Sequence, residues 1–115
     1  MTQDTVEMAE FFKCLSEPVR LRILYLLLAH KELCVCDLVS GLGLSQSVVS
    51  RHLAYMRKTG LVNTRRDGVW IYYQLEAQLP PMVLSVLAAF RQGAANCQQM
   101  VEDLQSIKNP MAACQ

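Results

Sequence analysis

Two cysteines separated by a single residue are the first side chains in this sequence that could do chemistry. Cys34 and Cys36 flank Val35, and their thiolates are soft donors that prefer thiophilic ions to magnesium or calcium. Residues i and i+2 of a regular α-helix point about 200° apart, so the two sulfurs can bind one ion only if the helix unwinds or if the pair lies in its first turn. Binding at this pair would therefore distort the helix, as a switch requires.

The other three cysteines carry weaker signals. Cys14 lies in an apolar helical segment, where we expect a packed core thiol. Cys97 falls on one face of a predicted helix, where packing is favoured over metal binding, and no element determines the position of Cys114 in the tail. Five cysteines are an odd number, and Cys34 and Cys36 are too close for an ordinary disulfide. We therefore expect thiols in a reducing cytoplasm rather than a secreted disulfide scaffold.

A second group of candidates is a run of basic side chains between positions 51 and 66, where the sequence contains no acidic residue. The whole chain has a net charge of only +1, but DNA binding requires positive charge only on the face that contacts phosphates. Serine, glutamine and arginine can also form hydrogen bonds with base edges. A solvated charged face is the alternative interpretation. The predicted DNA-contacting residues are Ser45, Gln46, Ser47, Ser50, Arg51, Arg57, Lys58, Arg65 and Arg66.

Hydrophobic spacing and helix caps predict the elements that must position these side chains. Asp4, three residues before Glu7, begins a capping-box pattern for a first helix. Pro18 suits the first turn of a second helix. Ser45 can cap a helix over 46–58, and the short helix before it completes a helix-turn-helix.

Strand-forming residues follow these helices, with an Asp-Gly turn signal at positions 67 and 68. Apolar residues with helical spacing then continue from residue 80. We therefore predict a mainly α fold with a small β-hairpin, an α+β winged helix-turn-helix that forms a single domain over 1–115. Its predicted parts are dimerisation helices at 1–15 and 80–108, the helix-turn-helix at 33–58 and the β-wing at 61–75.

Length and composition exclude several classes of function. The chain has 115 residues, of which 52% are hydrophobic, and this length allows one domain. Its longest apolar run is shorter than the ~18 residues of a membrane span, and its polar start is no signal peptide. We expect a soluble, cytoplasmic protein with no membrane partner. The sequence has no C-x-x-C motif, catalytic His/Asp constellation or Gly-rich phosphate loop, so we do not expect an enzyme.

The sequence resembles the ArsR/SmtB repressor family, in particular its arsenical-resistance (ArsR) type. The resemblance covers roughly residues 8–75 and includes the family's metal box, recognition helix, wing and opening helices. The motifs that carry it are ELCVCDL at 32–38, SRHL at 50–53, GLV at 60–62, RDGVWIYY at 66–73 and LSEPVRLRIL at 15–24.

This resemblance implies a homodimeric repressor that binds an inverted-repeat operator in double-stranded DNA, needs no cofactor, and leaves when As(III) or Sb(III) binds the paired cysteines. The same box is typical of some cadmium and lead sensors, and a thiol redox or persulfide sensor of the same fold is a further alternative. Arsenic-type members usually carry a third cysteine where this chain has Val39. The third sulfur would come from Cys97 or Cys114, less readily from Cys14, or binding would use only two.

Overall fold

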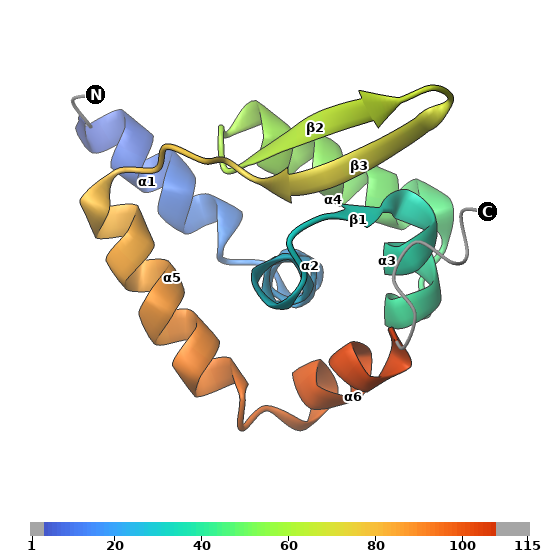
Figure 1. Ribbon diagram of the computed structural model, residues 1–115. Coiled ribbons are helices and arrows are strands. Elements are labelled where there is room, and N and C mark those ends of the chain that lie inside the picture. Colours follow the sequence, from blue (N-terminus) through green and yellow to red (C-terminus); the bar gives the residue numbers. More distant parts are fainter. Residues whose placement is uncertain (1–3, 108–115) are drawn as a thin grey trace.

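Six helices and a three-stranded antiparallel sheet make up the computed structural model, which describes residues 4–107 (Figure 1). The central helix, α2, is surrounded by the other elements. The arrangement confirms the predicted mainly α winged helix-turn-helix. In chain order the elements are α1 (Thr5–Cys14), α2 (Pro18–Ala29), β1 (Leu33–Cys34), α3 (Val35–Leu42), α4 (Gln46–Lys58), β2 (Val62–Asp67), β3 (Trp70–Leu75), α5 (Pro81–Ala94) and α6 (Gln98–Ser106).

Local signals begin three of the helices where the sequence predicts them. The Oδ1 atom of Asp4 accepts a hydrogen bond from the Glu7 N–H at 2.8 Å, and the Oγ atom of Ser45 accepts one from the Val48 N–H at 3.3 Å. Pro18 lies in the first turn of α2. The two caps satisfy backbone N–H groups that have no partner within the first helical turn. Helices α1, α2 and α4 therefore begin as predicted.

The turn between α3 and α4 depends on one glycine. Gly43 has a left-handed φ of 68°, and its N–H donates to the Val39 carbonyl at the C-terminal end of α3. Gly41, two residues earlier, lies inside α3, where an added Cβ would come within 2.5 Å of the Ile107 side chain. Gly41 therefore allows the C-terminal end of α6 to approach α3 closely.

The wing is a three-stranded sheet rather than the predicted two-stranded hairpin. Strands β2 and β3 pair across a turn in which Gly68 has a φ of 63°, as the Asp-Gly signal predicted. The third strand, β1, pairs with the other edge of β3, with Leu33 opposite Tyr73 and Cys34 opposite Tyr72. Two residues are too few to show the alternating pattern of a strand, so β1 cannot be predicted from the sequence. Cys34 is therefore part of the wing sheet.

The C-terminal part of the described chain contains two helices where we predicted one over 80–108. Helix α5 ends at Ala94 and α6 begins at Gln98, and the chain turns between them so that α6 packs against α2 and α3 (Figure 1). The apolar spacing continues across this break, which is why the sequence predicted a single helix. Contacts with α2 and α3 determine the direction of α6 instead. Cys97, on the predicted apolar face, is the exposed N-cap of α6.

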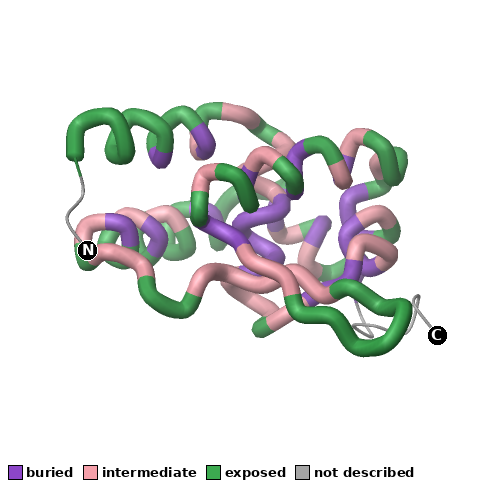
Figure 2. Tube along the Cα trace, turned by 90° about the horizontal axis from the view of Figure 1, so that it is seen from above, coloured by how far each residue is buried: buried purple, intermediate pink, exposed green. Residues whose placement is uncertain are grey.

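Buried apolar side chains from the helices and the wing form one main core. Figure 2 shows the buried segments gathered in the middle of the molecule and the exposed segments around them. Fully buried members of this core include Ile23, Leu38, Leu53 and Met56. Among residues 4–107, no helix combines the length and apolar character that a membrane crossing needs. Large apolar side chains that stay exposed on α1 and α5 are Val6, Met8, Phe12 and Leu84.

A buried ion pair fixes α6 to the rest of the domain. The Nε and Nη2 atoms of Arg22 each donate to the Asp103 carboxylate at 2.8 Å, and Nη2 also donates to the Leu42 carbonyl at 3.0 Å. The Asp103 side chain is only 3% exposed. Its hydrogen bond holds the pKa of Arg22 above its usual value. One guanidinium therefore connects α2, α3 and α6.

Replacement of Asp103 should reveal how much this pair matters. Asp103→Asn leaves the partly buried Arg22 charge without its counter-ion, so we expect the free energy of unfolding to fall by about 3 kcal/mol. The matched control is Glu102→Gln, an exposed neighbour on α6, with an expected change below about 0.5 kcal/mol. Urea denaturation at one fixed protein concentration measures both. A loss below about 1 kcal/mol for Asp103→Asn, the range of a surface ion pair, would contradict the assignment.

Candidate metal and DNA-binding sites

Cys34 and Cys36 lie where the wing sheet meets the helix-turn-helix. Cys34 ends β1 and is the N-cap of α3, with extended backbone angles of φ −84° and ψ 166°. Cys36 lies in the first turn of α3 and is half-buried. The sequence left two ways for the pair to bind one ion, namely an unwound helix or a position in the first turn. The pair has the first-turn position. The angle of about 200° between side chains i and i+2 holds only when both residues are helical, and Cys34 is not. Ligand binding therefore does not require α3 to unwind.

Asp37 brings a carboxylate next to this pair. Its Oδ2 atom accepts a hydrogen bond from the Cys34 backbone N–H at 3.1 Å and lies 3.3 Å from the Cys34 sulfur. The Cys34 and Asp37 side chains are both buried, at 2% and 3% exposure. A positively charged centre bound at Cys34 would be favoured by the nearby carboxylate. Asp37 is not among the residues predicted from the sequence, although its position at the third residue of a capped helix is a recognisable signal.

Of the other cysteines within residues 4–107, neither Cys14 nor Cys97 forms a metal-binding group with this pair. Cys14 is fully buried, as predicted, and burial raises the pKa of its thiol, which makes it a poor thiolate donor. Cys97 is exposed at the N-terminal end of α6, so it does not pack within the chain, and its packing against a second copy stays a prediction. The end of α6 that reaches α3 is the opposite one. Cys114 lies outside the described residues. The identity of a third sulfur ligand stays a prediction.

The described chain contains no preformed cage for a metal ion. Within residues 4–107, no group of three or more histidine, cysteine, aspartate or glutamate side chains could hold one. The free thiols in this range are Cys14, Cys36 and Cys97. Cys34 is disulfide-bonded, contrary to the thiol that the sequence predicts, so ligand-binding experiments on this pair require fully reduced protein.

Helix α4 presents most of the predicted DNA-contacting residues on its outer surface. Its inner face is anchored in the core by Val49, Leu53 and Met56, all fully buried. Ser50 is half-buried beside this face. The exposed predicted residues on and before α4 are Ser45, Gln46, Ser47, Arg51, Arg57 and Lys58. An exposed polar face without an acidic residue, on the second helix of a helix-turn-helix, fits the major groove of DNA.

The two wing arginines have different environments. Arg66 is exposed on β2. Arg65 instead donates from Nε and Nη2 to the Glu32 carboxylate, at 2.9 and 2.6 Å, and its guanidinium carbon lies 4.6 Å from the centre of the Tyr72 ring. The hydrogen bond from Arg65 lowers the pKa of Glu32. This ion pair could not be predicted from the sequence, because its members are 33 positions apart and no local pattern connects them.

Arg20 connects α1 to the recognition helix, α4. Its Nε atom donates to the Cys14 carbonyl at 2.8 Å, and its guanidinium carbon lies 4.2 Å from the centre of the Tyr55 ring on α4. Its Nη1 atom is 3.4 Å from Nδ1 of His52. Burial lowers the pKa of His52, an effect that nearby Glu17 opposes. Arg20 is therefore a structural residue that fixes the position of α4.

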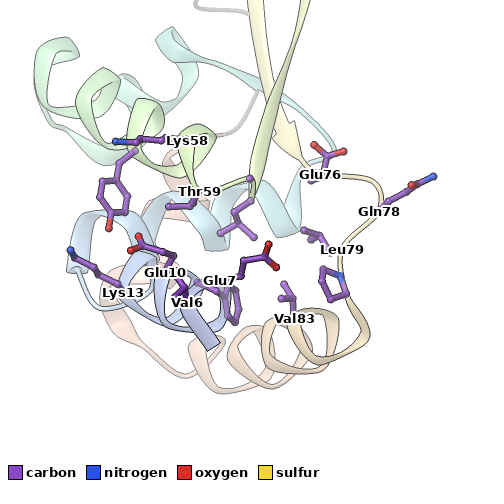
Figure 3. A pocket seen from close by; sticks show the side chains of 15 residues that line it. Val6, Glu7, Glu10, Lys13, Lys58, Thr59, Glu76, Gln78, Leu79 and Val83 are labelled. Carbon is purple, nitrogen blue, oxygen red and sulfur yellow. The ribbon is translucent and has the colours of Figure 1, made fainter. Parts of the chain in front are cut away.

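A separate cavity of about 830 Å³ lies between α1, the C-terminal end of α4 and the segment that joins β3 to α5 (Figure 3). Its floor is apolar and includes Phe11 and Val83, whereas Glu7, Glu10 and Lys58 supply charge around it. None of the cysteines in the described residues, 4–107, lines this cavity. It is therefore distinct from the thiol pair.

Comparisons with known proteins place these features in context. Residues 17–64 match the family described as "Bacterial regulatory protein, arsR family". The chain is 40% identical to the arsenic resistance transcriptional regulator ArsR2 of Pseudomonas putida, over 87% of this chain and 85% of that protein. It is 38% identical to the arsenical resistance operon repressor of Escherichia coli, over 83% of this chain and 82% of that protein.

Other relatives match over a shorter part. The arsenic resistance transcriptional regulator ArsR1 of P. putida is 45% identical over 66% of this chain, and the cadmium resistance transcriptional regulatory protein CadC of Listeria innocua is 40% identical over 61%. In both cases the chain spans 59% of the relative's own length.

Solved structures with the same architecture include HlyU from Vibrio cholerae. Its TM-score is 0.70, with 35% identity over 85% of this chain and all of that one. The AntR antimony-specific transcriptional repressor has a TM-score of 0.65, with 29% identity over 81% of each chain.

The outer face of α4 and the wing should contribute differently to DNA binding. With a duplex that the protein selects from random sequences, Arg51→Ala and Ser50→Ala should each weaken binding by about 1–3 kcal/mol. Arg66→Ala should instead weaken binding to all duplexes and reduce the salt slope by about 1. Fluorescence anisotropy at several salt concentrations measures both quantities.

The control for charge is Arg91→Ala, which removes an exposed arginine from α5 and should leave binding unchanged. If the α4 and wing variants all bind like the parent, the recognition helix and the wing are assigned wrongly.

Proposed function

The chain belongs to the ArsR family of bacterial regulatory proteins and is a winged-helix repressor of that type rather than an enzyme, and we propose that As(III) or Sb(III) releases it from an inverted-repeat operator by binding Cys34 and Cys36. A repressor of this kind acts on double-stranded DNA in the cytoplasm and needs no resident cofactor. The observation that carries the proposal is the location of the thiol pair at the junction of β1 and α3.

This location connects a soft-ligand site to both DNA-contacting elements. Cys34 belongs to the sheet that contains the wing, and α3, which it caps, leads through the Gly43 turn to α4. Thiolates favour thiophilic centres over magnesium or calcium. An inducer that draws Cys34 and Cys36 together would therefore change the start of α3 and the edge of the wing at the same time.

The choice of trivalent arsenic or antimony is supported by the relatives. Two relatives that match over more than 80% of the chain are named for arsenic or arsenical resistance, and a structural neighbour is named as antimony-specific. A trivalent arsenic centre prefers three thiolates, and we propose that Cys97 or Cys114 supplies the third in preference to the buried Cys14. Cadmium is the second candidate inducer, because a 40% identical relative is named for cadmium resistance.

We also propose that two copies associate through α1 and α5. Val6, Phe12 and Leu84 are 69%, 49% and 53% exposed in the single chain, although their burial would be favourable. A two-fold dimer also matches the symmetry of an inverted repeat. Of the two helices within the predicted 80–108 segment, α6 packs against α2 and α3, so we assign the contact between copies to α5.

Sedimentation velocity at micromolar concentration tests this association. The parent should sediment as a dimer, and Leu84→Glu should shift it to a monomer, because a charge would be buried in the apolar contact. Val69→Glu is the matched control, since Val69 is an equally apolar side chain that is 84% exposed at the wing turn, and it should remain dimeric. A parent that is monomeric with and without DNA would refute the dimer.

The inducer is tested by operator release from reduced protein. Cys34→Ser and Cys36→Ser should bind the operator with nearly the parent's affinity, since neither side chain lies on the outer face of α4, but arsenite should no longer release them, because serine supplies no soft donor. Titrations of the parent with antimonite, cadmium, zinc and peroxide rank the alternatives.

Single Cys97→Ser and Cys114→Ser variants identify the third ligand as the one whose loss abolishes release. If the Cys34→Ser/Cys36→Ser double variant is still released by arsenite, the sensor lies elsewhere and the proposal is wrong.

A further inference from the structure

Cys34, Tyr72 and Arg65 lie at one level of the wing sheet. Cys34 on β1 is opposite Tyr72 on β3, and Tyr72 is opposite Arg65 on β2. Side chains of residues that are directly opposite in an antiparallel sheet share a face. The side chains of Cys34 and Arg65 therefore extend from the same face of the sheet, on either side of the central strand, β3.

The Glu32–Arg65 ion pair crosses this central strand. Glu32 precedes Cys34 by two residues, and its carboxylate accepts from Nε and Nη2 of Arg65 at 2.9 and 2.6 Å. The Arg65 guanidinium also stacks on the Tyr72 ring at 4.6 Å. A bidentate pair fixes the orientation of a guanidinium as well as its position. The segment that carries the thiol pair is thus directly attached to an arginine of the wing.

This attachment leaves Arg65 able to contact DNA. The Arg65 side chain is 45% exposed, and that of Glu32 is 19% exposed. Two of the five guanidinium N–H groups point to Glu32, so three remain for a phosphate. Because the stacking and the carboxylate together restrict the guanidinium, a phosphate contact would lose less side-chain entropy than one made by an unrestrained arginine.

We propose that Glu32 is a positioning residue that couples the thiol pair to the wing. Without inducer, Glu32 holds Arg65 in the orientation that contacts the operator backbone. When a thiophilic ligand binds Cys34 and Cys36, the segment 32–36 moves, the Glu32 carboxylate leaves the guanidinium, and Arg65 loses that orientation. This inference rests on the proposed function and names the contact through which the inducer acts on the wing.

The test compares Glu32→Gln with the parent in reduced form. The release factor is the operator Kd with arsenite divided by the Kd without it, both measured by fluorescence anisotropy. Glu32→Gln keeps the shape of the side chain but not its charge, and an exposed ion pair adds little to stability, so the variant should fold. We expect its release factor to fall by about tenfold, which is 1.4 kcal/mol of coupling. Glu102→Gln, an exposed glutamate on α6, should behave like the parent.

Two further readouts separate coupling from other effects. Arsenite bound per protein, measured by equilibrium dialysis without DNA, should be the same for Glu32→Gln and the parent. In an Arg65→Gln background, Glu32→Gln should cause no further change in the release factor, since its partner is absent. Reduced arsenite binding by Glu32→Gln, or an additional effect in the Arg65→Gln background, would overturn the coupling role.

The outcomes distinguish this inference from the proposed function. A parent that arsenite releases, together with a Glu32→Gln variant that it releases equally, overturns the coupling role alone. A parent that arsenite does not release refutes the proposed inducer and the coupling with it.

Discussion

The interactions of Cys34 impose the constraint on which the rest of the site depends. This residue is the last of β1, paired with Tyr72, and also the N-cap of α3, where Asp37 accepts from its backbone N–H at 3.1 Å. The two roles require an extended backbone at a helix start, and they attach the wing sheet and the helix-turn-helix to the same peptide. A change in the geometry of the pair therefore affects both elements that we propose contact DNA.

The charged residues explain how a chain of net charge +1 can present a basic face. Several acidic side chains are engaged in internal contacts: Asp103 with Arg22, Glu32 with Arg65, and Asp37 with the backbone of Cys34. The outer face of α4 has no acidic residue. Its basic side chains are thus available for phosphates, and the internal ion pairs fix the elements that carry them.

Local patterns predicted the elements that depend on local interactions. The cap at Ser45 and the turn at Gly68 were recognised because each acts within a few residues of itself. Strand β1 was missed because its two residues are strand only through their pairing with β3. The break between α5 and α6 was missed because long-range packing of α6 overrides a continuous apolar pattern. The thiol pair was identified from the sequence because its two cysteines are neighbours in the chain. The role of Glu32 was not, because it depends on contact with Arg65 on β2.

Amide hydrogen exchange of the reduced protein, with and without arsenite, tests the central claim most directly, because it reports the sheet and each helix separately. We predict that arsenite changes the exchange of amides in β1, in the facing part of β3 and in the first turn of α3. A change confined to α5 and α6, with the exchange of residues 32–36 and 72–73 unaltered, would contradict it.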